Sequence, residues 1–356
     1  MISLNKTHES FLKSNKASEI LFAHDIPVGN LETLDSKTIQ VLEKALNEIN
    51  LTREEVLLLT MVEMNHVSIL MSVSNFLRKK YKGELISFSK NIFIPLTQLC
   101  RDQCSYCTFK YEPGEGDLFF SPEKVLEAAK KSTELGCTEM LFVSGDKPEL
   151  MYDVYKKELE KIGYSSTSDY MIGMSELCLE EGIFPHSNLG IAKIDELKRF
   201  KNSNPSMGLM LESISERLME PGEAHYRCPD KYPRARIKTI SDAGKLNIPW
   251  TSGILIGIGE NWEERVDSII ELKRINDEFG HIQEIIIQNF SPKPGIKMEG
   301  SPVPTDLDMI KTVAISKILM GKDVNIQVPP NLNAKTYTLH IFSGVNDLGG
   351  VSPLTI

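Results

Sequence analysis

Several features are absent from this sequence of 356 residues, and each absence excludes a class of protein. Lys and Arg total 40 against 49 Asp and Glu, so the net charge of −9 gives no electrostatic basis for binding nucleic acid or an anionic membrane. No apolar run of membrane-spanning length occurs, because Glu63, Asn65 and His66 interrupt the most apolar stretch, 56–73. The first residues lack the apolar core of a signal peptide. We therefore expect a soluble, cytoplasmic protein that acts on a small-molecule substrate.

Cysteine is also scarce, and its placement is informative. Three of the six cysteines, Cys100, Cys104 and Cys107, lie within eight residues, and the other three are scattered. In a cytosolic chain of this size, such clustering favours a metal or cluster site over a disulfide framework.

The apolar pattern predicts an α/β fold in which helices precede a (β/α) barrel. Helical spacing runs over 37–80, where Thr52 and Glu55 form a capping box that starts a second helix. Beyond residue 88, apolar runs alternate with amphipathic helices, which implies a parallel sheet covered on both faces. Seven or eight such units indicate a closed or nearly closed barrel over 88–356, after an N-terminal helical extension over 1–87. The predicted strands contain 92–94, 140–143, 183–184, 207–211, 254–256, 285–287 and 325–328.

The three clustered cysteines form a C-x3-C-x2-C triplet directly after the first barrel strand. Three thiolates can hold three irons of a [4Fe-4S] cluster and leave the fourth iron open, where the amino and carboxylate groups of S-adenosylmethionine (SAM) can bind. Structural zinc is one alternative, but zinc prefers four ligands, and the triplet has no second pair or nearby His. Three unrelated buried thiols are the other alternative, which the tight spacing disfavours.

The triplet and the barrel pattern resemble the radical SAM superfamily, in which an aromatic residue such as Tyr106 is typical before the third cysteine. The resemblance implies a TIM-type or nearly closed barrel, a [4Fe-4S] cluster and bound SAM, with Tyr106 and Ile256 near the adenine. Ser144, Gly145 and Asp146 stand where the superfamily carries a short Gly-rich element, so they are predicted to contact the methionine ammonium. A turn after a strand is the alternative for that element.

Two further elements complete the predicted SAM site. Glu212 is expected at the end of the fourth strand, where a carboxylate could bind ribose hydroxyls, and Arg217 could hold the SAM carboxylate. An ordinary helix-start salt bridge is the alternative. The strand from Gly253 to Glu260 resembles the superfamily's Gly-x-Ile-x-Gly-x-x-Glu element, although close packing could also explain its glycines.

Longer stretches of the sequence narrow the resemblance to one family. Cys228 departs from that family's pattern, in which a small polar residue is more usual at this position. The matching stretches are 94–97, 107–109, 145–149, 208–213, 220–222, 229–231, 251–260, 288–290, 328–333 and 346–355. Together they resemble the CofG-type subunit of 7,8-didemethyl-8-hydroxy-5-deazariboflavin synthase. The resemblance implies cyclisation of 5-amino-5-(4-hydroxybenzyl)-6-(D-ribitylimino)-5,6-dihydrouracil to the deazaflavin, with loss of ammonia. It also implies a partner synthase that supplies this adduct and an electron-donor protein.

Polar residues near the late strands are candidate substrate contacts. A ligand with uracil, phenol and polyol groups needs many neutral donors and acceptors at the barrel mouth. Turn and cap chemistry is the commoner role of Asn and Asp, and it stays open for each candidate. The candidates are Gln288, Asn289, Asn331, Asn346 and Asp347.

Two other functions stay open on the sequence. One is another radical SAM activity, of biotin-synthase-like or futalosine-pathway type, although no second cysteine set for an auxiliary cluster is evident. The other is a non-catalytic iron-sulfur protein, which would have no need of Glu212 or of the Gly-rich strand.

Overall fold

The computed structural model describes residues 34–354 and contains a closed barrel of parallel strands. Each strand pairs with the next one along the chain, and β8 closes the barrel against β1. Residues 1–33, which include the segment assessed for a signal peptide, lie outside the described range. The strands are β1 (Ser87–Thr97), β2 (Glu139–Ser144), β3 (Phe184–Asn188), β4 (Ser206–Gly208), β5 (Trp250–Ile256), β6 (Ile282–Asn289), β7 (Asn325–Gln327) and β8 (Asp347–Val351).

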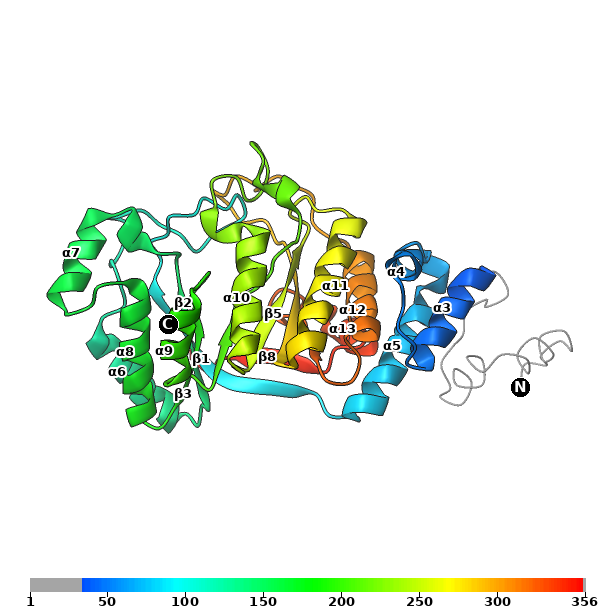
Figure 1. The fold of residues 1–356 in the computed structure, drawn as a ribbon, viewed down its shortest axis with the longest axis horizontal. Coiled ribbons are helices and arrows are strands. Elements are labelled where there is room, and N and C mark those ends of the chain that lie inside the picture. The colour runs from blue at the N-terminus through cyan, green and yellow to red at the C-terminus, as the bar shows by residue number, and fades with distance from the viewer. Residues whose placement is uncertain (1–33, 355–356) are drawn as a thin grey trace, which may run out of the picture.

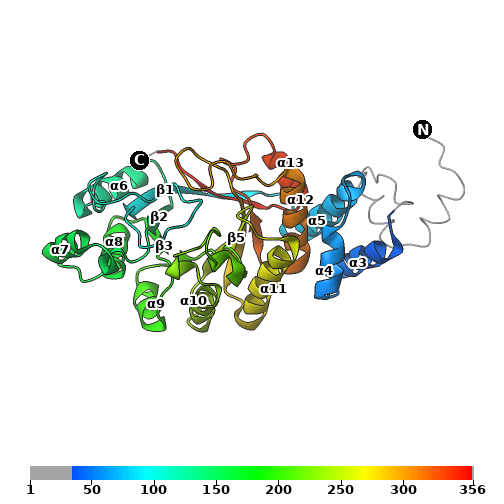
Figure 2. The same cartoon turned by 90° about the horizontal axis from the view of Figure 1, so that it is seen from above.

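Helices surround the barrel, as Figure 2 shows, and a further group of helices lies beside α12 at one side of the molecule (Figure 1). The helices that precede β1 are α3 (Ser36–Leu46), α4 (Arg53–Thr60) and α5 (Val67–Lys82). The later helices are α6 (Pro122–Glu134), α7 (Asp153–Lys161), α8 (Thr167–Glu180), α9 (Ile194–Lys201), α10 (Pro233–Lys245), α11 (Trp262–Phe279), α12 (Asp306–Met320) and α13 (Tyr337–Phe342).

The apolar runs correctly predicted the first seven strands, and β8 was the strand that they did not mark. Its residues include Gly349 and Gly350 and form no continuous apolar run, so it is recognisable only by its pairing with β1. Successive side chains of β1 point to opposite faces of the strand, so their burial alternates. Ile92 and Ile94 are fully buried in the main core, whereas Phe93 between them is 41% exposed.

The helices before β1 pack against the barrel's outer helices. The predicted capping box of Thr52 and Glu55 is confirmed at the start of α4. The helical pattern is broken where α4 ends, and α5 begins only at Val67, after a short 3-10 turn. Arg53 Nη2 lies 2.8 Å from Asp267 Oδ2 of α11, and Lys311 Nζ of α12 donates to the Thr60 carbonyl at 3.0 Å. These contacts fix the helices to the barrel, and the domain boundary at residues 87 and 88 stays a prediction.

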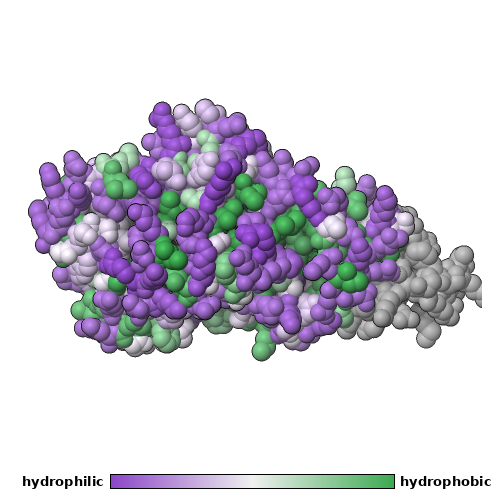
Figure 3. All heavy atoms as spheres, viewed as in Figure 1, coloured by the Kyte–Doolittle hydropathy of each residue, from purple (hydrophilic) through white to green (hydrophobic). Residues whose placement is uncertain are grey.

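One face of the molecule can be judged from its hydropathy colouring (Figure 3). The face in Figure 3 is mostly hydrophilic, with apolar side chains in small patches. Between residues 34 and 354, no single helix is long and apolar enough to cross a membrane. The segments Arg53–Thr60 and Met64–Lys82 meet the length and composition test only as a pair, which is bent by 103°.

Glu212 does not end the fourth strand as predicted. Strand β4 stops at Gly208, and Glu212 lies beyond it with a φ of 65°, in the left-handed region. Its N–H donates to the Gly253 carbonyl at 3.1 Å, and its carbonyl accepts from Leu255 N at 2.9 Å. Pairing with β3 ends at Gly208, opposite the last residue of β3, and contacts with β5 hold Glu212 beyond it, at the carboxyl end of the barrel.

Candidate functional site

The three clustered cysteines line one cavity of about 400 Å³ at the carboxyl end of β1. All three are free thiols and are half-buried. The N–H of Asp146 donates to Cys100 Sγ at 3.1 Å, and the N–H of Phe109 donates to Cys107 Sγ at 3.4 Å. Burial raises the pKa of Cys100 to about 12, so its thiolate needs a strong electrophile such as a metal ion.

The end of β2 brings Asp146 against the cysteine loop. A Cβ on Gly145 would stand 1.9 Å from the Leu99 carbonyl oxygen, so only glycine allows this close approach. The carboxylate of Asp146 pairs with Arg101, but its Oδ1 is buried and has no hydrogen-bond partner among the described residues. Burial and the nearby Asp230 raise the pKa of Asp146 to about 7, against the opposing effect of Arg101. The site therefore presents an unsatisfied acceptor close to Cys100 Sγ.

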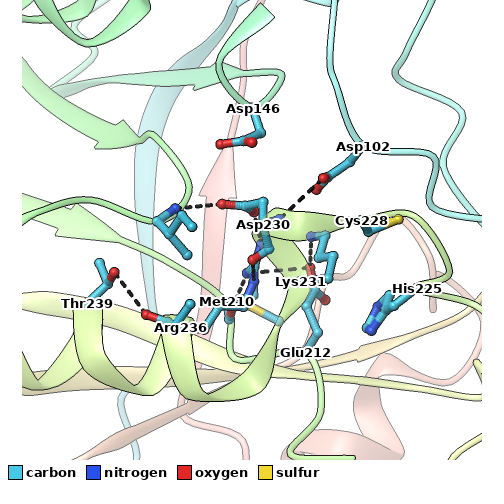
Figure 4. A network of polar contacts seen from close by, with 12 residues as sticks. Asp102, Asp146, Met210, Glu212, His225, Cys228, Asp230, Lys231, Arg236 and Thr239 are labelled. Atoms are coloured by element: carbon cyan, nitrogen blue, oxygen red, sulfur yellow. Dashed lines mark hydrogen bonds and ion pairs between the residues drawn. The ribbon is translucent and has the colours of Figure 1, made fainter. Parts of the chain in front are cut away.

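A buried network of charges lies beside the cysteine loop (Figure 4). Lys231 Nζ donates to Glu212 Oε1 at 2.7 Å, Arg236 pairs with Asp230, and the N–H of Asp230 donates to Asp102 Oδ1 at 3.3 Å. Although burial opposes ionisation, Lys231 and Arg236 hold the pKa of Glu212 below its ordinary value. Glu212 is therefore an ionised acceptor whose position is fixed by two cations.

Tyr106 contacts a buried histidine. Its hydroxyl oxygen lies 3.0 Å from His225 Nε2, and the two rings meet edge-on with centroids 5.6 Å apart. Burial lowers the pKa of His225 to about 3, so the imidazole is neutral. Tyr106 also packs against the apolar cluster that contains Leu255 and Ile258. The cysteine loop is therefore anchored to the carboxyl end of β5 through Tyr106.

Comparisons with known proteins agree with this arrangement. The family model described as Radical SAM superfamily matches residues 94–272. The chain is 48% identical over 273 residues to the 7,8-didemethyl-8-hydroxy-5-deazariboflavin synthase of Methanopyrus kandleri, a match that covers 76% of this chain and 81% of that protein. It is 51% identical over 270 residues to the protein of the same name from Methanothermobacter thermautotrophicus, with the same two coverages. The chain belongs to the 7,8-didemethyl-8-hydroxy-5-deazariboflavin synthase family.

Solved structures confirm the predicted fold of this deazariboflavin synthase family member. Methylornithine synthase (PylB) superposes with a TM-score of 0.71 at 18% identity, covering 89% of this chain and 87% of that one. HydG, a maturase of the [FeFe]-hydrogenase, superposes with a TM-score of 0.74 at 17% identity, covering 96% and 72%. These likenesses concern the fold alone, and the family matches establish the chain as a radical SAM enzyme.

Radical SAM enzymes use a [4Fe-4S] cluster and SAM, and the residues at this site of the deazariboflavin synthase family member fit both groups. Three free thiols open into one cavity, and backbone N–H groups are directed at two of their sulfurs. The unpartnered Oδ1 of Asp146 is a ready acceptor for an ammonium group. Gly190 keeps the space beside it clear, because a Cβ there would stand 3.3 Å from that oxygen and 2.7 Å from Asp230 Oδ1.

The structure brings several predicted SAM contacts together and separates others. Gly145 and Asp146 meet the cysteine loop, and Ser144 pairs with Thr97 at the end of β1. Ile256 is fully buried in the main core, and its neighbour Leu255 belongs to the apolar cluster against which Tyr106 packs. Gly253 lies against β6, where a Cβ would stand 2.2 Å from the Ile286 carbonyl oxygen, so close packing explains this glycine.

Arg217 forms the salt bridge that the sequence left open. Its Nη2 lies 2.9 Å from Glu264 Oε2 of α11 and donates to the Gly259 carbonyl at 2.7 Å. This salt bridge satisfies the Arg217 guanidinium, so a contact with SAM is not needed to explain the residue.

The candidate substrate contacts divide between the two ends of the barrel. Gln288 and Asn289 end β6, and Asn289 Oδ1 accepts from Asn333 Nδ2 at 2.8 Å. The exposed Asn331 lies in the loop after β7. Asn346 and Asp347 were expected at the mouth, but they lie at the amino end of β8, because this strand begins at Asp347.

Asn346 is occupied by strand contacts. It is buried, and it accepts from Ile326 N at 3.0 Å and donates to Asn325 Oδ1 at 2.8 Å. Its side chain therefore joins β7 to the start of β8, which is the cap-like role that the sequence had left open.

A fourth cysteine lies beside the triplet, which the spacing in the sequence did not reveal. Cys228 Sγ accepts from Gln103 N at 3.3 Å. The possible ligand atoms of Asp102, Cys104 and Cys228 all lie within 4.8 Å of one another. The long loop after β4 thus places a scattered cysteine next to the predicted cluster.

The same loop supplies most of the residues that sequence reasoning missed. His225 contacts Tyr106, and Asp230 and Lys231 form the short 3-10 helix Pro229–Lys231 that anchors the charge network. Arg236 follows in α10. In the sequence, Asp230 and Lys231 were marked by the matching stretch 229–231, and His225 and Arg236 lay outside it. An irregular loop has no periodicity from which the direction of its side chains could be predicted.

Proposed function

We propose that this enzyme cyclises 5-amino-5-(4-hydroxybenzyl)-6-(D-ribitylimino)-5,6-dihydrouracil to 7,8-didemethyl-8-hydroxy-5-deazariboflavin, with release of ammonia. The observation that carries the proposal is the set of three free cysteines around one cavity at the carboxyl end of the barrel. This set occurs in a chain that is about half identical to proteins with that synthase name, at 48% and 51%.

Cys100, Cys104 and Cys107 would hold the [4Fe-4S] cluster, and SAM would bind at its open iron. When bound, the two groups supply a carbon-centred radical that takes a hydrogen atom from the substrate. Backbone donors to Cys100 and Cys107 would stabilise the negative charge on the sulfurs. Cys137 is remote from the triplet in sequence, so its replacement is a control for the replacement of the three proposed ligands.

The remaining SAM contacts follow from the buried acceptors. Asp146 Oδ1 would accept the methionine ammonium, and the ionised Glu212 would accept the ribose hydroxyls. Tyr106 and Leu255 would flank the adenine from the apolar cluster that they share. Because Lys231 and Arg236 already neutralise Glu212, this carboxylate can bind hydroxyls without attracting a cation of its own.

Two protein partners belong to the proposal and rest on the family resemblance. A partner synthase would supply the adduct, and an electron-donor protein would reduce the cluster. Gln288 and Asn289, at the end of β6, stay candidate contacts for the uracil and phenol groups. A cytoplasmic location stays a prediction from the sequence.

Anaerobic turnover tests the proposed function. The enzyme with a reconstituted cluster receives SAM, a chemical reductant, and either the purified adduct or free tyrosine, without the partner synthase. We expect the adduct to give fluorescent deazaflavin, 5'-deoxyadenosine, methionine and ammonia, and tyrosine to give little above background, because remote binding groups position the reacting centre. Rapid turnover of tyrosine with none of the adduct would contradict the assignment and favour the partner's chemistry.

A further inference from the structure

A second chamber, of about 300 Å³, lies inside the barrel towards the amino ends of its strands. None of the cluster cysteines lines it. Its walls come from almost every strand, and most of its side chains are polar. We call it the lower chamber; its main polar residues are Asn91, Glu139, His186, Thr251, Glu284 and Gln327.

The lower chamber is linked to the cysteine loop by an aromatic pair. Phe93 is the next residue on the same face of β1 as Asn91, about 7 Å further along the strand. Its ring is 41% exposed and meets Phe109 edge-on, with centroids 6.4 Å apart. Phe109 in turn donates its N–H to Cys107 Sγ at 3.4 Å. A ligand that spans this distance would meet an aromatic wall first and polar groups below it.

The polar groups of the lower chamber offer acceptors and a neutral imidazole. Thr251 Oγ1 donates to Glu284 Oε1 at 2.9 Å, which orients this carboxyl group. His186 Nδ1 lies 2.8 Å from Ser206 Oγ, so Nε2 is the ring nitrogen available to a ligand. Burial lowers the pKa of His186, so this nitrogen is uncharged. Gly208 leaves room beside it, because a Cβ there would stand 3.0 Å from His186 Nε2.

The charge of the lower chamber restricts the ligand. Glu139, Glu284 and Asp347 line it, and no Lys or Arg between residues 34 and 354 does, so a phosphate or carboxylate would meet repulsion. A metal ion is not favoured either. Among the residues that the structure describes, no three possible ligand side chains of this chamber bring their ligand atoms within 4.8 Å of one another. A neutral group with several hydroxyls matches the acceptors and donors that remain.

We propose that the lower chamber binds the unphosphorylated polyol chain of the substrate, with Glu284 and Gln327 as specificity-determining contacts. The aromatic and uracil parts would then lie above it, towards Phe93 and the cysteine loop. This assignment rests on the proposed function, whose substrate carries a ribityl chain. A volume of about 300 Å³ is sufficient for a five-carbon polyol with bridging water.

Turnover of two substrates tests the assignment. Wild type, Glu284→Gln and Gln327→Leu are compared on the ribityl adduct and on an analogue whose ribityl chain is cut to hydroxyethyl. We expect each variant to lower kcat/KM about tenfold or more on the ribityl adduct and less than about twofold on the short analogue. Glu180→Gln, at the exposed end of α8, is the matched control and should change neither value. Iron content and thermal stability establish that each variant is folded.

Equilibrium binding separates this inference from the proposed function. The probes are 5-amino-6-ribitylaminouracil, its 5'-phosphate and its hydroxyethyl analogue, added to wild-type protein without turnover. We expect the neutral ribityl compound to bind at least about tenfold more tightly than either of the others. If wild type fails to convert the adduct, the proposed function fails, and these affinities still decide the polyol assignment. Equal affinities, or equal losses on both substrates in the variants, would overturn it.

Discussion

Two buried carboxylates at the carboxyl end of the barrel, Glu212 and Asp230, and one at the amino end, Glu284, have pKa values shifted in opposite directions. At the carboxyl end, Glu212 and Asp230 are compensated by Lys231 and Arg236, so the carboxylates stay ionised. At the amino end, no cation of the described chain lines the chamber that holds Glu284, and burial, reinforced by Asp347, raises the pKa of Glu284 to about 7. The paired cations thus keep Glu212 and Asp230 available as fixed anions. The lower chamber, where Glu284 has no such partner among the described residues, is suited to neutral ligands.

The largest effect should come from the three proposed cluster ligands, which lie at the carboxyl end. Replacing Cys100, Cys104 or Cys107 by Ala should reduce bound iron from about four per chain to almost none and abolish the EPR signal of the reduced cluster. Iron analysis and EPR with and without SAM measure this. Cys137→Ala is the control and should keep both.

Cys228 makes this test sharper, because it lies beside Cys104. Cys228→Ala should keep the cluster, since the three triplet thiols suffice. If Cys228→Ala loses the cluster while a triplet variant keeps it, the ligand assignment is wrong.

Removing a cation from the buried ion pairs at the carboxyl end should lower the free energy of unfolding more than removing a surface cation. Arg236→Met leaves Asp230 buried without its cation, which typically destabilises a protein by about 3–5 kcal/mol. Urea denaturation followed by circular dichroism measures this. Arg274→Met removes an exposed pair with Glu271 and should cost about 1 kcal/mol or less. Similar losses in the two variants would show that the buried network is no more important than a surface pair.

A smaller effect is expected from Glu212 itself. Glu212→Gln keeps the shape of the side chain but loses a charged acceptor, so SAM affinity should fall about ten- to a hundredfold with iron content unchanged. Calorimetry under anaerobic conditions measures the affinity. Arg217→Gln should change it less than about twofold, because Glu264 already accounts for that guanidinium. Unchanged affinity in Glu212→Gln would assign this carboxylate to structure alone.

The smallest effect is the pH dependence that the amino end adds. The pKa of Glu284 is raised from its ordinary value of 4.5 to about 7, so between these values the folded state binds more protons than the unfolded state. Its contribution to stability is present below pH 4.5 and is lost as the pH rises through 7. Glu284→Gln should therefore make unfolding free energy less pH-dependent over this window, by at most about 1.4 kcal/mol per pH unit. Parallel pH profiles of variant and wild type would contradict the shift.

Local sequence determined much of this protein. Strand runs, the capping box of Thr52 and Glu55 and the spacing of the cysteine triplet depend on residues close together in the chain, so periodicity and spacing revealed them. Gly145 meets the cysteine loop because loops after neighbouring parallel strands lie at one end of a barrel, and the SAM contact predicted for Ser144-Gly145-Asp146 stays a prediction.

Only the tertiary structure decided the rest. Strand β8 lacks an apolar run, so its place beside β1, and with it the amino-end position of Asp347, follows from barrel closure alone. Cys228 reaches Cys104 from 124 positions away along the chain, through an irregular loop with no repeating pattern. Whether a carboxylate such as Glu212 or Glu284 stays ionised depends on which side chains closure brings beside it, because electrostatic interactions act through space and not along the sequence.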